Sequence, residues 1–293
     1  MRVGVAFPTT EIGTDPAVIR DYAQAVEEMG FHHLTMIDHV LQEPAQPDAE
    51  EWQTYYSLKN MFHEPLVLFG FLAACTARIQ LATAILILPQ RPAVLVAKQA
   101  AELDILTKGR IRLGVGVGWN EVEFKALNQD FKNRGPRMEE QIALMRALWT
   151  QDRVTFEGQW HRIDDAGINP LPVQRPIPVW FGAFAPPAIR RAARLGDGWY
   201  ANPFFGGLDE ETRRDVAIFR QAAAEADRDP ASVGLDGTLR TADKTPDQWV
   251  AEAESWRQLG ASHVTVRTMK AGLTDPKAHL EVLRQFKAAW PTL

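Results

Sequence analysis

Asp38 and His39 are the residues of this chain best suited to proton chemistry. They follow the apolar run 34–37, which is expected to be a strand, and therefore lie at its carboxyl end. Parallel barrels carry their active sites at that end. An imidazole gains and loses a proton near neutral pH, so His39 could act as a general acid or base. The same pair could equally form an ion pair that braces a loop, and position alone does not separate these interpretations.

Glycines recur at every second position near the end of another expected strand, 111–115. Gly114, Gly116 and Gly118 precede Trp119. Alternate residues of a strand point to the same side, so one side of this segment carries no side chains. A flat ligand or a neighbouring backbone could approach there. The spacing differs from the dinucleotide-binding fingerprint, which has two residues before its third glycine.

Two further features favour the binding of an anion. Gly182, Ala183 and Phe184 join the expected strand 178–181 to a helix that begins with prolines. Backbone amides at the positive end of a helix attract anions, although a plain turn would have the same composition. Arg240 and Arg267 are expected at the ends of two more strands, where a guanidinium group can hold a carboxylate or a phosphate.

The composition excludes several classes of function. The chain has 293 residues, of which 46% are hydrophobic and 24% charged, with a net charge of −5. This mildly acidic balance argues against nucleic acid as a main partner. No apolar run approaches the roughly 20 residues of a membrane span, and the single Cys75 cannot form an internal disulfide, so a cytoplasmic protein is expected. Metal-ligand spacing, a Gly-x-Ser-x-Gly elbow and a Walker lysine loop are all missing from the sequence.

The elements that must position these residues alternate between strand and helix. Strands are expected at 3–7, 34–37, 79–87, 111–115, 178–181, 197–201, 233–239 and 264–267. Helical patterns lie between them at 16–30, 64–76, 93–106, 137–149, 186–195, 208–226 and 246–259, with a closing helix at 276–290 and a short piece at 121–127. Eight such repeats predict a single (β/α)8 TIM barrel domain over residues 1–293. Residues 153–163 interrupt the rhythm, and a small hairpin insertion is predicted there around Glu157–Gly158. Two long loops, 40–63 and 129–136, are expected at the carboxyl face as walls of a site.

Taken together, these segments resemble the luciferase-like monooxygenase superfamily. Within it they are most similar to the branch of oxidoreductases that use the deazaflavin coenzyme F420. The matching segments are 38–39, 64–66, 97–99, 103–104, 109–111, 114–119, Phe131, Arg134, 139–140 and 191–199.

The resemblance implies where a cofactor would bind. Its ring system would lie across the barrel mouth, with Asp38 and His39 at the ring's edge and Gly116, Gly118 and Trp119 along the ring or its side chain. The ring would be backed by a bulge formed by Thr83, Ala84 and Ile85, with a cis peptide bond between the last two. Gly182, Ala183 and Phe184 would hold the phosphate. Ala183 stands where the family often has a second glycine, and alanine resists a positive φ.

The same resemblance implies a hydride transfer between F420 and a small organic substrate. His39 would donate the proton, Arg240 or Arg267 would anchor an anionic substrate, and the loop 40–63, with Trp52 and Tyr56, would form the substrate wall. One alternative is a monooxygenase that uses FMN and molecular oxygen. A second is a barrel that binds a cofactor without turnover. The superfamily suggests a homodimer.

Overall fold

The strands form where β-branched and other apolar residues run together, and a helix follows each one. The computed structural model describes residues 1–44, 56–201, 207–273 and 275–290. Its parallel sheet contains β1 (Arg2–Ala6), β2 (His33–Met36), β3 (Gln80–Thr83), β5 (Ile111–Gly116), β8 (Val179–Gly182), β9 (Gly198–Ala201), β10 (Gly234–Arg240) and β11 (His263–Arg267). β1 pairs with β11 and β3 with β5, so the sheet closes on itself. The predicted (β/α)8 barrel is confirmed.

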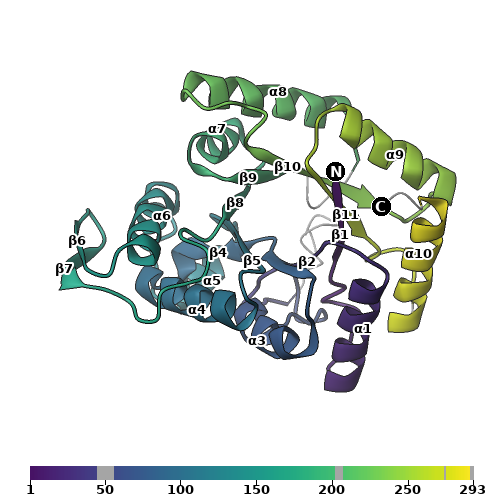
Figure 1. Ribbon diagram of the computed structural model, residues 1–293, viewed down its shortest axis with the longest axis horizontal. Helices are drawn as coiled ribbons and strands as arrows, with labels where there is room; N and C mark the ends of the chain where they lie inside the picture. The colour runs from purple at the N-terminus through teal and green to yellow at the C-terminus, as the bar shows by residue number, and fades with distance from the viewer. Residues whose placement is uncertain (45–55, 202–206, 274, 291–293) are drawn as a thin grey trace.

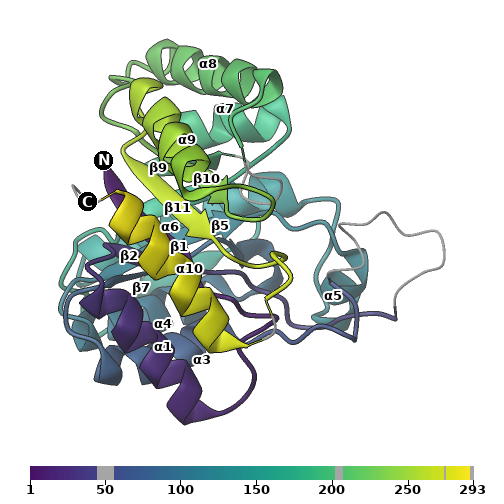
Figure 2. The same cartoon turned by 90° about the vertical axis from the view of Figure 1, so that its right-hand side faces the viewer.

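Helices surround the strands as an outer ring (Figure 1). In chain order they are α1 (Pro16–Glu28), α3 (Pro65–Cys75), α4 (Ala93–Leu106), α6 (Arg134–Thr150), α7 (Pro186–Leu195), α8 (Glu210–Glu225), α9 (Pro246–Gln258) and α10 (Pro276–Ala289). Many begin with a proline after a capping side chain, as in α9, where Thr245 and Gln248 form a capping box. The short α5 (Glu121–Ala126) lies at the end of the molecule opposite the two termini (Figure 2). In the described part of the chain, no helix has the length and apolarity needed to cross a membrane.

The third strand differs from the continuous segment expected at 79–87. It consists of β3 and the short β4 (Leu86–Ile87), which pairs with β5 beyond a bulge. The peptide bond between Ala84 and Ile85 in this bulge is cis, as the resemblance implied. The two pieces could not be separated in the sequence because residues on both sides of the bulge are apolar and buried.

The predicted hairpin is present and slightly longer than expected. β6 (Val154–Glu157) pairs with the antiparallel β7 (Arg162–Ala166) outside the barrel, beside α6 (Figure 1). Glu140 of α6 accepts hydrogen bonds from the backbone amides of residues 159–161, which ties the turn to the helix. A Cβ atom on Gly158 would lie 2.4 Å from the Glu140 carboxyl carbon, so a side chain there would displace this carboxylate.

Charged groups fill the barrel interior near the amino ends of the strands. Arg112 lies 3.3 Å from the carboxylate of Asp236 and 4.4 Å from the ring centre of Trp180. The ring of His33 is 3.4 Å from the same carboxylate. Burial alone would raise the pKa of Asp236, but the hydrogen bond from His33 and the charge of Arg112 hold that pKa at about 2. The interior is therefore closed at this end by a charge-balanced network.

Candidate active site

A cavity of about 240 Å³ opens at the carboxyl ends of β2, β5 and β8. Its walls are mostly apolar, and they come from strand ends, the bulge and the first turn of α7. The lining residues are Ile37, Asp38, His39, Tyr56, Ala84, Ile85, Ile87, Gly116, Val117, Gly118, Trp119, Gly182, Ala183, Phe184, Ala185 and Ala188. Complete ligand pockets usually measure roughly 300–1,000 Å³. This cavity therefore suits an apolar ring system rather than a whole large cofactor.

The cavity brings together all but one of the residues predicted to contact a cofactor. Asp38, Ala84, Ile85, Gly116, Gly118, Trp119, Gly182, Ala183 and Phe184 line it. The exception is Thr83, which is buried behind the wall. Its hydroxyl donates a hydrogen bond of 2.7 Å to the carbonyl oxygen of Gly114 and so holds the bulge against β5.

Gly114 and Gly116 make room for the bulge at residues 83–85. They are among the glycines predicted to leave one side of a strand without side chains. A Cβ atom on Gly116 would lie 2.6 Å from Cδ1 of Ile85, and one on Gly182 would lie 2.7 Å from its Cγ2. At Gly114 the added atom would be 1.9 Å from the carbonyl oxygen of Thr83. The glycines thus let the bulge approach closely and place Ile85 in the cavity wall.

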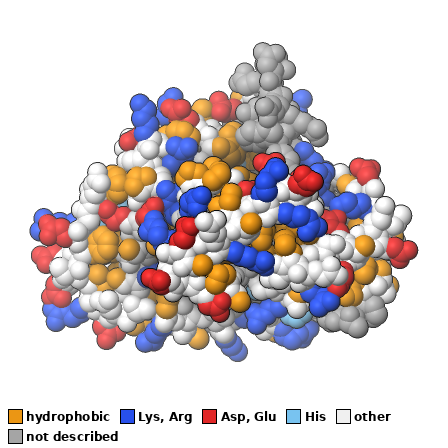
Figure 3. Space-filling view, turned by 90° about the horizontal axis from the view of Figure 1, so that it is seen from above, with side chains coloured by type: hydrophobic (Ala, Val, Ile, Leu, Met, Phe, Trp, Pro, Cys, Tyr) orange, Lys and Arg blue, Asp and Glu red, His pale blue; other side chains and the backbone are white. Residues whose placement is uncertain are grey.

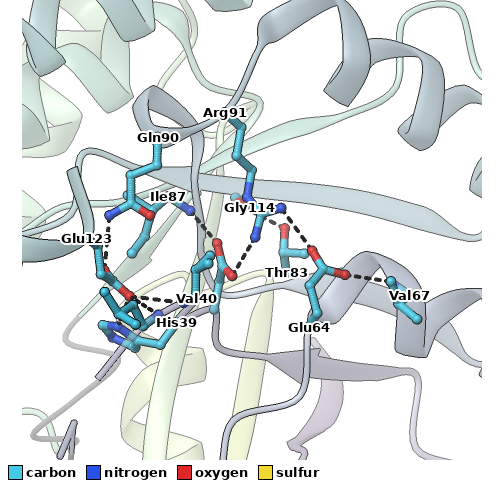
Figure 4. Close-up of polar contacts among 12 residues, drawn as sticks. His39, Val40, Glu64, Val67, Thr83, Ile87, Gln90, Arg91, Gly114 and Glu123 are labelled. Carbon is cyan, nitrogen blue, oxygen red and sulfur yellow. Dashed lines mark hydrogen bonds and ion pairs between the residues drawn. The ribbon is translucent and has the colours of Figure 1, made fainter. Parts of the chain in front are cut away.

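Asp38 is held in an ion-pair network at the edge of the cavity. Its carboxylate accepts a hydrogen bond of 3.0 Å from the amide of Ile87 and one of 2.7 Å from Arg91. Arg91 also binds Glu64 at 2.9 Å, the contact drawn in Figure 4. Burial raises the pKa of Asp38, and the charge of Arg91 opposes the rise. Asp38 therefore forms an ion pair at the barrel mouth, but its partner is Arg91 and not the adjacent His39.

His39 is held by a different carboxylate, that of Glu123 in α5. The Nδ1 atom of His39 lies 3.0 Å from Oε1 of Glu123, which also accepts hydrogen bonds from the amides of Val40 and Leu41. Its Oε2 accepts a bond of 3.0 Å from Gln90, so four donors surround one carboxylate (Figure 4). Burial would raise the pKa of Glu123, but the hydrogen bond and charge interaction with His39 and the bond from Gln90 hold it below its ordinary value.

This arrangement fixes the tautomer of His39. An ionised carboxylate only accepts hydrogen bonds, so the proton of the neutral imidazole must be on Nδ1. The Nε2 atom then carries the lone pair. Among the described residues, three aromatic rings pack around the imidazole, with ring centres 4.4 Å away for Tyr56, 5.0 Å for Phe62 and 5.9 Å for Trp119.

The predicted substrate residues fall in different places. Tyr56 lines the main cavity. Arg267 lines a smaller void that adjoins it, and Arg240 lines neither, although the two arginines are paired in register on β10 and β11. Trp52 lies outside the described residues.

The amino end of α7 offers backbone groups to an anion. Its N-cap residue, Ala185, has no side chain that could cap the helix, and both Ala185 and Ala188 line the cavity. Ala183 is not among the residues with a positive φ, so alanine fits the backbone at this position without strain. The positive end of the helix therefore faces the cavity without a competing acidic side chain.

Sequence reasoning missed Glu123, Gln90 and Arg91, which hold the two predicted catalytic residues. Glu123 is in a short helix, and its contact with His39 spans 84 residues. Gln90 and Arg91 follow the strand expected at 79–87, and no feature of that segment predicts a role for them. One signal was available in the sequence. Glu123 is next to the apolar Phe124, and a glutamate carboxylate that is buried with such a neighbour needs hydrogen-bonding partners.

The structure offers no evident metal site among its described residues. In these ranges, no group of three or more His, Cys, Asp or Glu residues could hold a metal ion. Figure 3 shows acidic, basic and apolar side chains interspersed on one face of the molecule.

Nearly the whole chain matches one family. The model for luciferase-like monooxygenases aligns with residues 1–288. The F420-dependent glucose-6-phosphate dehydrogenase of Intrasporangium calvum is 33% identical over 257 residues, which cover 79% of this chain and 72% of that enzyme. The structure of a monooxygenase from Streptomyces bottropensis has a TM-score of 0.79 at 19% identity, covering 100% of this chain and 99% of the other. An F420-dependent secondary alcohol dehydrogenase, seen with an F420–acetone adduct, has a TM-score of 0.74 at 18% identity, covering 97% and 98%. The chain belongs to the luciferase-like monooxygenase family.

Proposed function

We propose that the protein is an F420-dependent oxidoreductase that transfers a hydride to or from a small organic substrate at the barrel mouth. The observation that carries the proposal is the position of His39, which lines an apolar, ring-sized cavity and is held by a buried carboxylate. The F420-dependent relative from Intrasporangium calvum supports this choice of cofactor.

The cavity fits a deazaflavin ring on two observations. Its wall at Ile85 exists only because Gly116 and Gly182 carry no side chain, which leaves an apolar surface for a flat ring. The amino end of α7 lies at the other side of the cavity and lacks a capping side chain, which suits the phosphate of the cofactor. Bound F420 would supply the hydride donor or acceptor.

His39 would manage the proton that accompanies the hydride. With Nδ1 bonded to Glu123, its Nε2 atom can accept a proton from a substrate hydroxyl when the substrate is oxidised. The same atom returns the proton in the reductive direction. Glu123 stabilises the imidazolium form between these steps, because its negative charge lies 3.0 Å from Nδ1. The rings of Tyr56 and Phe62 pack against the imidazole and hold its orientation.

Cofactor titration tests the proposal. The purified protein without cofactor is titrated with F420 and, separately, with FMN, and the quenching of ligand fluorescence gives both dissociation constants. We expect tighter binding of F420. Retention of FMN with no binding of F420 would instead support the FMN-dependent monooxygenase. Binding of F420 without turnover on any alcohol, enone or ketone would support the non-catalytic barrel.

A further inference from the structure

Aromatic rings border the cavity next to the imidazole of His39. We call Tyr56, Phe62 and Trp119, which pack around this imidazole, the aromatic corner. Tyr56 and Trp119 line the cavity, and their ring centres are 5.4 Å apart with the ring planes at 66°. Phe62 does not line the cavity and stacks on Tyr56, with ring centres 5.7 Å apart. The cavity therefore has two steeply inclined aromatic walls beside the group that handles the proton.

The backbone fixes the position of Trp119. Gly118, the residue before it, has a φ of 69°, a conformation that residues with a side chain rarely adopt. A Cβ atom on Gly118 would also lie 2.6 Å from Cγ2 of Ile87. Both constraints favour glycine at this turn, after which the ring of Trp119 lies 5.9 Å from that of His39. Tyr56 is only 6% exposed, so its ring is also held by packing.

The described lining of the cavity contains no lysine or arginine. Its ionisable side chains are Asp38, His39 and Tyr56. Both oxygens of Asp38 already accept hydrogen bonds, one from the amide of Ile87 and one from Arg91. The sequence has no lysine or arginine at 45–55 or 202–206, which lie outside the described residues, so these segments cannot supply a cation.

Two nearby features attract anions, but neither serves a substrate in the cavity. Arg267 lines the smaller adjoining void rather than the cavity. Burial lowers the pKa of its guanidinium group and the nearby Tyr56 and Glu11 oppose this, so groups of the protein already engage its charge. The amino end of α7 is assigned to the phosphate of the cofactor by the proposed function. An anionic substrate would therefore lose its hydration without gaining a cationic partner, which is strongly unfavourable.

We propose that the substrate is an uncharged ketone or alcohol that carries an aromatic ring, and that Tyr56 and Trp119 select this ring. The reacting group of the substrate must reach His39, which places the rest of the molecule beside the aromatic corner. A flat ring stacks on one of the two inclined walls and meets the edge of the other, and aromatic rings prefer both arrangements.

This inference rests on the proposed function, for which it names the substrate class. It replaces the anionic substrate expected from Arg240 and Arg267. It also separates this chain from the relative in Intrasporangium calvum, which is named for glucose 6-phosphate, an anion.

The test measures the binding of four ketones to the protein saturated with oxidised F420. Oxidised F420 cannot reduce a ketone, so isothermal titration calorimetry reports binding alone. Acetophenone and cyclohexyl methyl ketone share one carbon skeleton, and only the first has a flat aromatic ring. We expect acetophenone to bind about 5-fold more tightly, the usual effect of an aromatic pair beyond its buried area. The para-acetyl derivatives benzamide and benzoate share one shape and differ in charge. We expect the amide to bind at least about 10-fold more tightly than the carboxylate.

Variants of the aromatic corner identify the residues that select the ring. Tyr56→Leu should remove the preference for acetophenone, and Tyr56→Phe should keep it, because phenylalanine retains the ring. Phe71→Leu is the matched control. It removes an aromatic ring that is 38% exposed on α3 and does not line the cavity, and it should leave the preference unchanged. Should Tyr56→Leu fail to fold, Trp119→Leu compared with Trp119→Phe decides in the same way.

Three results would overturn the inference. One is cyclohexyl methyl ketone binding as tightly as acetophenone or more tightly. Another is a full preference for acetophenone in Tyr56→Leu. The third is para-acetylbenzoate binding as tightly as para-acetylbenzamide or more tightly, which would show that the site accepts anions.

The proposed function fails separately. The fluorescence of F420 shows, before any ketone is added, whether this cofactor binds. If F420 binds and the ketone preferences are missing, the inference falls and the proposed function stands. If F420 does not bind, the proposed function falls. The four titrations are then made on the protein saturated with oxidised FMN, or on the protein alone if FMN does not bind either, and the same outcomes decide.

Discussion

Replacement of Glu123 by glutamine isolates the charge of the carboxylate that holds His39. In this variant the side-chain oxygen can stay toward His39 and the amide of Val40, and the new NH2 group faces Gln90. The oxygen of Gln90 is buried and has no hydrogen-bond partner among the described residues, so a rotation of its amide accepts the new donor. Glu123→Gln therefore keeps the number of hydrogen bonds and loses only the charge.

The expected loss of stability follows from this geometry. Four donors contact a carboxylate that is 0% exposed. A hydrogen bond to a charged group contributes roughly 1.5–3 kcal/mol and a neutral one roughly 0.5–1.5 kcal/mol, but ionisation in a buried site also has a desolvation cost. We expect Glu123→Gln to lower the free energy of unfolding by about 2 kcal/mol. Glu123→Ala leaves the donors without an acceptor and should lower it by about 4 kcal/mol.

The loss should also depend on pH in a definite direction. The pKa of Glu123 is below its ordinary value, because His39, Gln90 and the backbone donors outweigh the effect of burial. A carboxyl group with a lowered pKa in the folded state stabilises the protein above the unfolded-state pKa, about 4.3, and this contribution disappears as the pH falls through the folded-state value. The gap between wild type and Glu123→Gln should therefore be full at pH 7 and shrink as the pH falls below the unfolded-state value.

Urea denaturation at several pH values measures this gap directly. Titrating groups that do not contact Glu123 are common to both proteins and cancel in the difference. Equal stability of the two proteins at pH 7 would refute the reasoning. A gap that does not change between neutral and acidic pH would show that its cause is not the charge of Glu123.

Two other predictions concern the barrel interior and the anion site. Asp236→Asn leaves the Arg112 guanidinium buried without its carboxylate, so urea denaturation at pH 7 should show a loss of about 3–5 kcal/mol. Because the pKa of Asp236 is lowered to about 2 from 3.8, about 2 kcal/mol of that gap should disappear as the pH falls through this range, and a constant gap would contradict the assignment. Ala185→Asp should cap α7 and raise stability by about 1 kcal/mol, yet weaken F420 binding about 10-fold or more, because its carboxylate repels the phosphate. Ala185→Asn should stabilise equally with little effect on affinity, and equal F420 affinities for the two variants would place the phosphate elsewhere.

The fold could be predicted because it depends on local patterns. Apolar runs of strand length alternate with helical spacing, and both signals are contained in short windows of the sequence. The break at Ala84–Ile85 follows from the resemblance rather than from any local pattern, because residues on both sides are equally apolar. The hairpin was visible at Gly158, whose turn is fixed by Glu140.

The candidate site could be predicted only in part, because its contacts join distant segments. The position of Asp38 and His39 at the end of β2 was visible. Their separate partners, Arg91 and Glu123, were not, since both contacts depend on how loops fold over the barrel mouth. The homodimer stays a prediction.

Anaerobic turnover with reduced F420 tests the central claim most directly. The wild-type protein and His39→Asn are mixed with reduced F420 and an enone, and reoxidation of the cofactor is followed by its absorbance. The account predicts turnover without oxygen in the wild type. In His39→Asn it predicts a loss of about 100-fold, because asparagine cannot supply the proton, with F420 affinity within a few-fold of wild type. Full turnover in His39→Asn, or turnover that requires oxygen and FMN, would contradict it.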